Sequence, residues 1–208
     1  MKKVVDFFKL AERLECEYRL TRMSDGACQS VASHSWNMAM MAIALQPLLK
    51  ETINMEKVLK MCILHDLPEA VAHDVPLHQQ NPDICAKKHD QESCVIAQIV
   101  NLLENPEISN CFKEYEKRVS LEARFVKALD RLDTGVQHLC AKDLTYVGGF
   151  KDNFYWKLFF SEDFAKSFDF EPALKDVFEE IKIRVSNRLK EEFKIDSSKF
   201  IRGENENS

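Results

Sequence analysis

Glycine and proline are scarce in this chain, and their scarcity limits the folds that are open to it. The 208 residues contain only 5 Gly and 6 Pro, so long intervals lack the residues that make tight turns. Hydrophobic residues make up 45% and charged residues 30%, as in an ordinary globular protein. We therefore predict a single all-α domain over residues 1–195, with a core of its own. Residues 196–208 form a polar C-terminal tail that is expected to be flexible.

The pattern of apolar residues predicts an amphipathic first helix and a buried second helix. From Val4 to Leu14, apolar side chains recur at three- and four-residue spacing, which places them on one stripe of a helix. The polar stretch that follows, YRLTRMSDGACQS (residues 18–30), is interpreted as a loop. The next run is apolar nearly all round, so we expect a central helix that Ser30 caps and that ends near Pro47.

Further helices are expected along the rest of the chain, and one of them contains a proline. Asn54 is expected to cap a helix that continues to Ala72, with a kink or a break at Pro68. Because the residue before a proline avoids helical geometry, Val75-Pro76 should end this helix. The remaining long helices are predicted to begin at Pro82, at Ser120 and at Pro172, the last reaching about Phe193.

Charge and cysteine content exclude several classes of protein. The net charge is −5 and no dense Lys/Arg run occurs, so a long nucleic acid is not an expected partner. Seven cysteines without a C-x-x-C pair indicate neither a disulfide framework nor a cysteine-rich zinc site. No stretch approaches the roughly 18 uncharged apolar residues of a membrane span, and no signal-length apolar run follows the N-terminus. We therefore expect a cytoplasmic protein that has no membrane partner.

Histidine precedes aspartate three times, and the first pair is the strongest candidate for chemistry. His65-Asp66 ends an apolar run, and on a continuous helix Glu69 would lie on the same arc one turn further along. A buried carboxylate is costly unless it is paired or bound to a metal. The plainer alternative is a histidine that is hydrogen-bonded to a neighbouring acid at a helix end.

Two other apolar helices each carry a side chain that can bind a metal. His34 lies in VASHSWNMAMMA, and Asp130 lies in ARFVKALDRLDT. Burying these groups unpaired would be costly, so we expect them to converge with His65 and Asp66 on one cation. Two nitrogen and two oxygen ligands suit a borderline divalent ion such as Mn²⁺, Co²⁺, Fe²⁺ or Zn²⁺, with positions left for water and substrate.

The other two His-Asp pairs are weaker candidates. His73 remains a rival ligand, but about two helical turns, roughly 12 Å, would separate it from His65. His89-Asp90 lies in the mixed-charge run CAKKHDQESC, which is interpreted as a solvated face. Two further histidines have no acidic neighbour in sequence and receive no role: His78 and His138.

The ordered set His34, His65-Asp66 and Asp130 resembles the H…HD…D signature of the HD-domain metal-dependent phosphohydrolases. HDLPEAVAHDVP is similar to the H-D-x-x-E-x-x-x-x-D-[IVL]-P block of the branch that contains bacterial 5′-deoxynucleotidases. EARFVKALDRLD resembles the helix E-A-x-x-V-x-x-[AL]-D-[KR]-L-[DE] of the same branch. The resemblance covers about residues 5–185 and implies an HD-type helical bundle around one buried divalent ion, Mn, Co, Fe, Zn or Mg.

The resemblance also implies roles for individual residues. His34, His65, Asp66 and Asp130 would hold the metal. Glu69 would orient or deprotonate the attacking water. Two substrate contacts are implied besides: Asp74 would face the sugar and favour one that lacks the 2′-hydroxyl, and Arg19 would contact the phosphate. Leu20 departs from the branch, which has an aromatic residue at that position.

The implied activity is hydrolysis of (deoxy)nucleoside 5′-monophosphates to nucleoside and phosphate, by a protein that is expected to be a homodimer. Two alternatives stay open. One is an HD hydrolase of another nucleotide, such as a nucleoside triphosphate or an alarmone. The other is a catalytically inactive HD-type binding module, because fold and function separate easily. Glu69 and Asp74 speak against a purely structural site, which would need neither of them.

Overall fold

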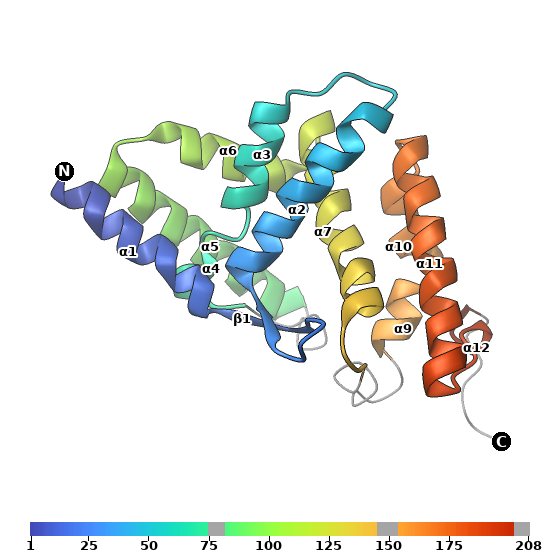
Figure 1. Ribbon diagram of the computed structural model, residues 1–208. Helices are drawn as coiled ribbons and strands as arrows, with labels where there is room; N and C mark the ends of the chain where they lie inside the picture. Colours follow the sequence, from blue (N-terminus) through green and yellow to red (C-terminus); the bar gives the residue numbers. More distant parts are fainter. Residues whose placement is uncertain (75–81, 145–153, 202–208) are drawn as a thin grey trace.

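The computed structural model describes residues 1–74, 82–144 and 154–201, and helices dominate it (Figure 1). The helices are α1 (Lys2–Cys16), α2 (Val31–Leu45), α3 (Met55–Leu64), α4 (Glu69–Ala72), α5 (Pro82–Leu103), α6 (Pro106–Lys117), α7 (Leu121–Cys140), α9 (Phe154–Phe159), α10 (Glu162–Ala165), α11 (Pro172–Phe193) and α12 (Ser198–Ile201). Short 3₁₀ turns follow α2 at Gln46–Leu48 and α10 at Lys166–Phe168. The sheet that this part of the chain forms has two strands, β1 (Tyr18–Arg22) and β2 (Cys28–Ser30). The prediction of an all-α fold is confirmed.

Three of the predicted helix starts carry the side-chain caps that the sequence indicated. The side chain of Ser30 accepts a hydrogen bond from the backbone N–H of Ser33. Asn54 caps α3 and Ser120 caps α7 in the same way. Each cap satisfies a backbone N–H that the first turn of a helix leaves without a partner.

One expectation about the first half of the chain is wrong, and another takes one of its two predicted forms. Residues 18–30 are a β-ribbon rather than a loop, because β1 and β2 pair antiparallel, with Tyr18 opposite Ser30 and Arg22 opposite Cys28. Of the kink or break predicted at Pro68 the structure has a break: α3 ends at Leu64, residues 65–68 form turns and a separate α4 follows to Ala72. Pro68 lies at the break, where its missing N–H and its ring disfavour a continuous helix. Val75-Pro76 lies outside the described residues.

One of the longer helices, α6, has no counterpart among the expected elements. Helix α6 begins at Pro106, and the side chain of Asn105 caps it through the backbone N–H of Glu107. The dipeptide Asn105-Pro106 repeats the signal that Asn81-Pro82 gave for α5, so the start of α6 could have been predicted from the same rule.

Two apolar clusters support the fold on either side of its centre. The larger one joins α2, α3 and α7 to the C-terminal helices, and Met38, Leu129 and Phe178 are among its buried members. The smaller one joins α1, α5 and α6 through residues such as Leu14 and Ile99. Figure 1 shows α2, α3 and α7 in the middle, with α1 and α5 to one side and α11 to the other. The middle helices are therefore held from both sides.

The C-terminal end of the described chain also contributes to packing. Helix α12 lies in the predicted polar tail, and its Phe200 is buried and stacks on Trp156 and Phe160. In the part of the chain that the structure describes, no helix combines the length and apolarity that crossing a membrane requires.

Candidate metal centre

Three predicted ligands meet where α2, the end of α3 and the following turn come together. His34, His65 and Asp66 each offer one ligand atom, and these atoms all lie within 4.8 Å of one another. Both histidines are buried, whereas the side chain of Asp66 is 20% exposed. Protein therefore covers the two histidines, whereas solvent can reach the aspartate.

The fourth predicted ligand, Asp130, reaches the same place from α7. Its Oδ1 lies 3.3 Å from Nε2 of His34. Its Oδ2 lies 2.6 Å from Nζ of Lys127, one turn earlier on the same helix. Asp130 is therefore adjacent to the compact group, with one oxygen on the histidine and the other on a lysine.

The histidine rings are oriented as metal ligands need to be. Nδ1 of His34 donates a hydrogen bond to Asp133 at 2.6 Å, and Nδ1 of His65 donates to the carbonyl oxygen of Cys62 at 3.0 Å. The Nε2 atoms of both rings are buried, and neither has a hydrogen-bond partner among the described residues, although carboxylate oxygens lie nearby. A ring that donates through Nδ1 leaves the lone pair of Nε2 for a cation. These residues therefore fit a divalent metal.

Asp133 supports this arrangement, and sequence reasoning missed its role. It is fully buried on α7 and accepts hydrogen bonds from His34, from Gln29 at 3.1 Å and from Asn37. The available signals were its position three residues after Asp130, which places both aspartates on one face of the helix, and its place as the last residue of EARFVKALDRLD. Its partners on β2 and α2 could not be seen from that spacing.

The charges around His34, His65 and Asp66 favour the binding of a cation. Burial and the nearby Arg19 lower the pKa of His34, but the carboxylates of Asp130 and Asp133 outweigh them and raise that pKa to about 9. Burial raises the pKa of Asp66, yet His65 and His34 hold it well below its usual range. In the absence of a metal, a proton on His34 therefore offsets part of the negative charge.

Glu69, the predicted water-handling residue, is buried at the start of α4. Its Oε1 lies 2.9 Å from Nζ of Lys88 on α5, and the same nitrogen lies 3.4 Å from Oε1 of Glu92. Burial and the charge of Asp66 raise the pKa of Glu69 to about 9, against the opposite effect of Lys88. Glu69 also raises the pKa of Lys88.

The interpretation of CAKKHDQESC as a solvated face is wrong for part of this run. Lys87 and His89 are exposed, and His89 pairs with Glu116 at 3.3 Å. Lys88 and Glu92 instead turn inward, with side chains 21% and 14% exposed. Their spacing of four residues puts them on one helix face. The sequence of a charged helix face does not show whether that face contacts water or a buried acid.

The two predicted substrate contacts lie at the edge of the group. A guanidinium nitrogen of Arg19, on β1, lies 3.7 Å from Oδ2 of Asp66. The side chain of Asp74 is partly buried, and its pKa is raised by burial against the opposing charges of Arg19 and Lys88. Leu20, the residue that departs from the branch, is 39% exposed.

The rival ligand His73 does not join the cluster. Its backbone has a φ of 64°, and its exposed ring places Nδ1 2.9 Å from Oε2 of Glu17. Glu17 also accepts the backbone N–H of Asp74 at 3.0 Å. His73 therefore lies on the far side of the helix break from His65. His78 lies outside the described residues.

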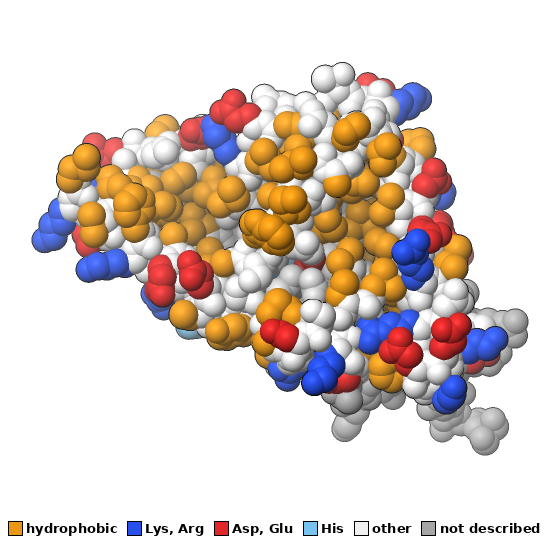
Figure 2. Space-filling view, viewed as in Figure 1, with side chains coloured by type: hydrophobic (Ala, Val, Ile, Leu, Met, Phe, Trp, Pro, Cys, Tyr) orange, Lys and Arg blue, Asp and Glu red, His pale blue; other side chains and the backbone are white. Residues whose placement is uncertain are grey.

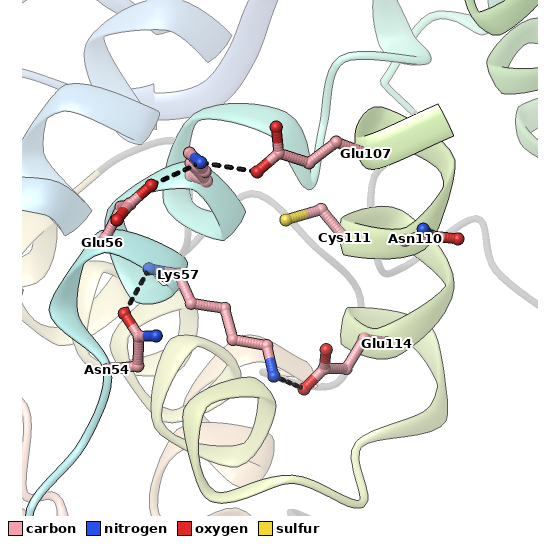
Figure 3. Close-up of a pocket in the computed structure, with 8 residues that line it drawn as sticks. Asn54, Glu56, Lys57, Glu107, Asn110, Cys111 and Glu114 are labelled. Carbon is pink, nitrogen blue, oxygen red and sulfur yellow. Dashed lines mark hydrogen bonds and ion pairs between the residues drawn. The ribbon is translucent and has the colours of Figure 1, made fainter. Parts of the chain in front are cut away.

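A pocket on the surface between α3 and α6 is separate from this group. It has a volume of about 270 Å³, and its charged side chains are paired with one another, including Lys57 with Glu114 and Lys60 with Glu107 (Figure 3). No predicted site residue lines it. Ion pairs already satisfy its charged groups, so it adds nothing to the chemistry of the metal centre.

Comparisons with known proteins agree with this geometry. A family model described as HD domain matches residues 11–165. The 5′-deoxynucleotidase HDDC2 of Danio rerio is 32% identical over 139 residues, which cover 65% of this chain and 64% of that protein. Its Homo sapiens counterpart is 29% identical over 130 residues, 61% of each chain. The chain thus spans slightly less than two thirds of the length of these relatives.

Solved structures share the fold. A crystal structure from Magnetospirillum magnetotacticum MS-1, described as a "Predicted metal-dependent phosphohydrolase", matches with a TM-score of 0.74 at 24% identity and covers 90% of this chain and 93% of that one. A conserved hypothetical protein from Pyrococcus furiosus matches with a TM-score of 0.64 at 29% identity, over 86% of this chain and 99% of that one.

Proposed function

This chain belongs to the HD-domain family, and from that membership we propose that it is a metal-dependent 5′-nucleotidase that hydrolyses (deoxy)nucleoside 5′-monophosphates. The observation that carries the proposal is the pair of buried Nε2 atoms on His34 and His65, which lack hydrogen-bond partners in the described chain and lie beside Asp66. The names of the curated relatives support the substrate class.

His34, His65, Asp66 and Asp130 would hold one divalent ion, which we expect to be Mn, Co, Fe, Zn or Mg. Nitrogen and oxygen ligands together suit this group of ions. When bound, such an ion supplies Lewis acidity that polarises a phosphoryl oxygen and makes water easier to deprotonate. The proton on His34 would leave when the ion binds, because ligand nitrogens must be unprotonated.

Three residues around this centre would have separate roles in the reaction. With Lys88 beside it and a divalent ion bound nearby, Glu69 would be ionised and would accept a proton from the attacking water as the water oxygen forms its bond to phosphorus. The bond between phosphorus and the ester oxygen would break, and that oxygen would leave on the nucleoside and take up a proton from water. Arg19 would offset charge on the phosphoryl oxygens, since a guanidinium can donate to two oxygens at once. Asp74 would contact the sugar and favour one without a 2′-hydroxyl.

We further propose that the protein works in the cytoplasm and forms a homodimer. The cysteines support a reducing compartment, because none of the six cysteines whose side chains are described forms a disulfide. The substrate would be a small nucleotide, in keeping with an acidic protein whose positive charge is local.

The test is a phosphate-release assay with AMP, dAMP, a nucleoside triphosphate and a guanosine polyphosphate under a panel of divalent ions. We expect release from the monophosphates, a preference for dAMP, and large losses in Glu69→Ala and Asp66→Ala. No release from the monophosphates with any ion would rule out the proposed 5′-nucleotidase, and full activity of both variants would rule out this mechanism. Release from the other nucleotides alone would point to a different HD hydrolase.

A further inference from the structure

The outward face of α2 is apolar along its whole length. Between Val31 and Leu45 the helix contains no Asp, Glu, Lys or Arg. Its inner side buries His34 and Met38, whereas Trp36, Met40 and Ile43 are 65%, 46% and 50% exposed. These three side chains follow one another at four- and three-residue spacing, so they form a single stripe. A helix that is hydrophobic all round is normally covered on every side.

The stripe belongs to a wider apolar surface. Helix α1, which packs against α2, exposes Val5 and Phe8, and Leu48 is exposed just after α2. Figure 2 shows hydrophobic side chains over α1 and α2, with most charged side chains toward the rim of this face. From ordinary side-chain sizes, these six residues expose on the order of 600 Å², close to the ~800 Å² per partner of a stable interface.

Resting on the homodimer proposed above, we propose that this face is its interface, with α2 packed against α2 of its partner about a two-fold axis. A two-fold interface brings a patch against itself, so any charge at its centre would meet a like charge. The stripe of Trp36, Met40 and Ile43 has no charge and avoids that cost. Because the other side of α2 carries His34, the dimer would also hold the helix that positions this residue.

Sedimentation equilibrium on the wild type, Trp36→Glu, Ile43→Glu and Val119→Glu tests the interface. Val119 is 81% exposed in the turn between α6 and α7, so it controls for adding one acidic residue in place of an exposed apolar one. We expect twice the chain mass of 24.1 kDa for the wild type and Val119→Glu, and the single mass for the other two. Circular dichroism verifies that each variant is folded. Two folded stripe variants that stay dimeric would overturn this interface alone, whereas a monomeric wild type would overturn the homodimer proposed above as well.

A second inference concerns Lys88 and rests on the proposed function. Lys88 and Lys87 are adjacent on α5, yet Lys87 points to solvent while Lys88 reaches a glutamate that is 3% exposed. A buried carboxylate needs a hydrogen-bonding partner, and Lys88 supplies it to Oε1 of Glu69. Oε2 of Glu69 receives no hydrogen bond from the side chains described. Glu92 holds the ammonium from its other side.

The geometry points to Lys88 as a positioning residue, which fixes one oxygen of Glu69 and leaves the other for the attacking water. Misplacing a reacting group by about 1 Å can cost roughly 100-fold in rate. We therefore expect Lys88→Met to lower kcat by about 10- to 100-fold with little change in KM, and Lys88→Arg to recover part of the loss. Lys87→Met should behave as the wild type.

Two readouts separate this inference from the proposed function. A calorimetric Mn²⁺ titration should give the same affinity for Lys88→Met as for the wild type, because Lys88 touches none of the proposed ligands. Crystal structures of the wild type and Lys88→Met should show the Glu69 side chain turned to a new rotamer in the variant. An unmoved Glu69 would overturn the role of Lys88 whatever the activity, and a rise in KM at constant kcat would assign Lys88 to substrate binding instead. An inactive wild type would count against the proposed function alone.

Discussion

Nδ1 of His34 lies 2.6 Å from Oδ2 of Asp133, and this contact joins the proposed metal centre to the middle of α7. Asp133 is fully buried, and its other hydrogen bonds, from Gln29, Asn37 and Gln137, fix its carboxylate in place. The ring of His34 is therefore held with Nε2 directed away from Asp133 and toward His65 and Asp66. Such outer contacts set both the orientation and the basicity of a ligand histidine.

Replacing Asp133 should weaken metal binding without removing a ligand. In Asp133→Asn the side chain keeps its size but loses the charge that raises the basicity of His34. We expect the Mn²⁺ dissociation constant, measured by calorimetry, to rise about 10- to 100-fold. Asp163→Asn serves as the control, because Asp163 is exposed and pairs only with a surface lysine. Equal affinities in the two variants would show that Asp133 does not tune the site.

Metal binding should stabilise the fold. An ion that binds only the folded chain stabilises it by about 2.7 kcal/mol when its concentration is 100 times its dissociation constant. We therefore expect a higher melting temperature with Mn²⁺ than with EDTA, and no difference between the two conditions in His34→Ala or His65→Ala. His89→Ala should keep the difference, because that ring is on the surface. A shift that survives in both ligand variants would place the ion elsewhere.

Arg19 should contribute to substrate binding more than to metal binding. Its guanidinium faces the carboxylate of Asp66 on the solvent-accessible side of the cluster, where a phosphate would enter. We expect Arg19→Met to lower kcat/KM by at least about 10-fold, the effect of losing roughly 1.4 kcal/mol of binding. Inhibition by inorganic phosphate should weaken in parallel. Arg13→Met, on the exposed surface of α1, is the matched control. Unchanged phosphate inhibition would exclude a phosphate contact.

His138 should make the fold sensitive to acid. Burial, helped by the charge of Arg188, lowers its pKa from 6.5 to about 3 in the folded chain. Between these values the unfolded chain takes up a proton that the folded chain does not, so the free energy of unfolding falls as the pH falls. The loss from this group reaches up to about 1.4 kcal/mol per pH unit.

The measurement is urea unfolding at pH 7 and pH 5 for the wild type and His138→Phe, whose ring cannot titrate. The ring of residue 138 lies against Trp156 and Phe159, an environment that suits phenylalanine. We expect the difference in unfolding free energy between the two pH values to be smaller in His138→Phe than in the wild type. His89→Gln should behave as the wild type, and equal differences in all three proteins would contradict the assignment.

The residues predicted to bind the metal stand out in the sequence because each interrupts an apolar run. His34 and Asp130 lie in helices and His65 directly follows α3, and the apolar neighbours of all three had to be buried, so their polar groups needed a common partner. Asp133 shares that property, but it was not distinguished because its partners Gln29 and Asn37 lie about a hundred residues away along the chain. Long-range contacts of this kind leave no spacing pattern.

The β-ribbon and the inward direction of Lys88 were missed because the local sequence pattern is compatible with two structures in each case. The ribbon over residues 18–30 contains mostly polar residues without clear alternation, so neither its pairing nor the contact of Gln29 with Asp133 was visible. Lys88 lies in a mixed-charge run, and its inward direction depends on where Glu69 falls after the break at Pro68. The break itself was one of the two outcomes predicted for that proline.

The β-ribbon couples the contact of Arg19 with Asp66 to the contact of Gln29 with Asp133. Its first strand carries Arg19, which faces Asp66, and its second carries Gln29, which holds Asp133 and in turn accepts a hydrogen bond from Thr21. A one-residue slip between paired strands sends every side chain to the opposite face. Deleting one residue from the short turn between the strands would thus disturb phosphate recognition and histidine alignment together, so natural variants of this turn should preserve its length more strictly than its composition.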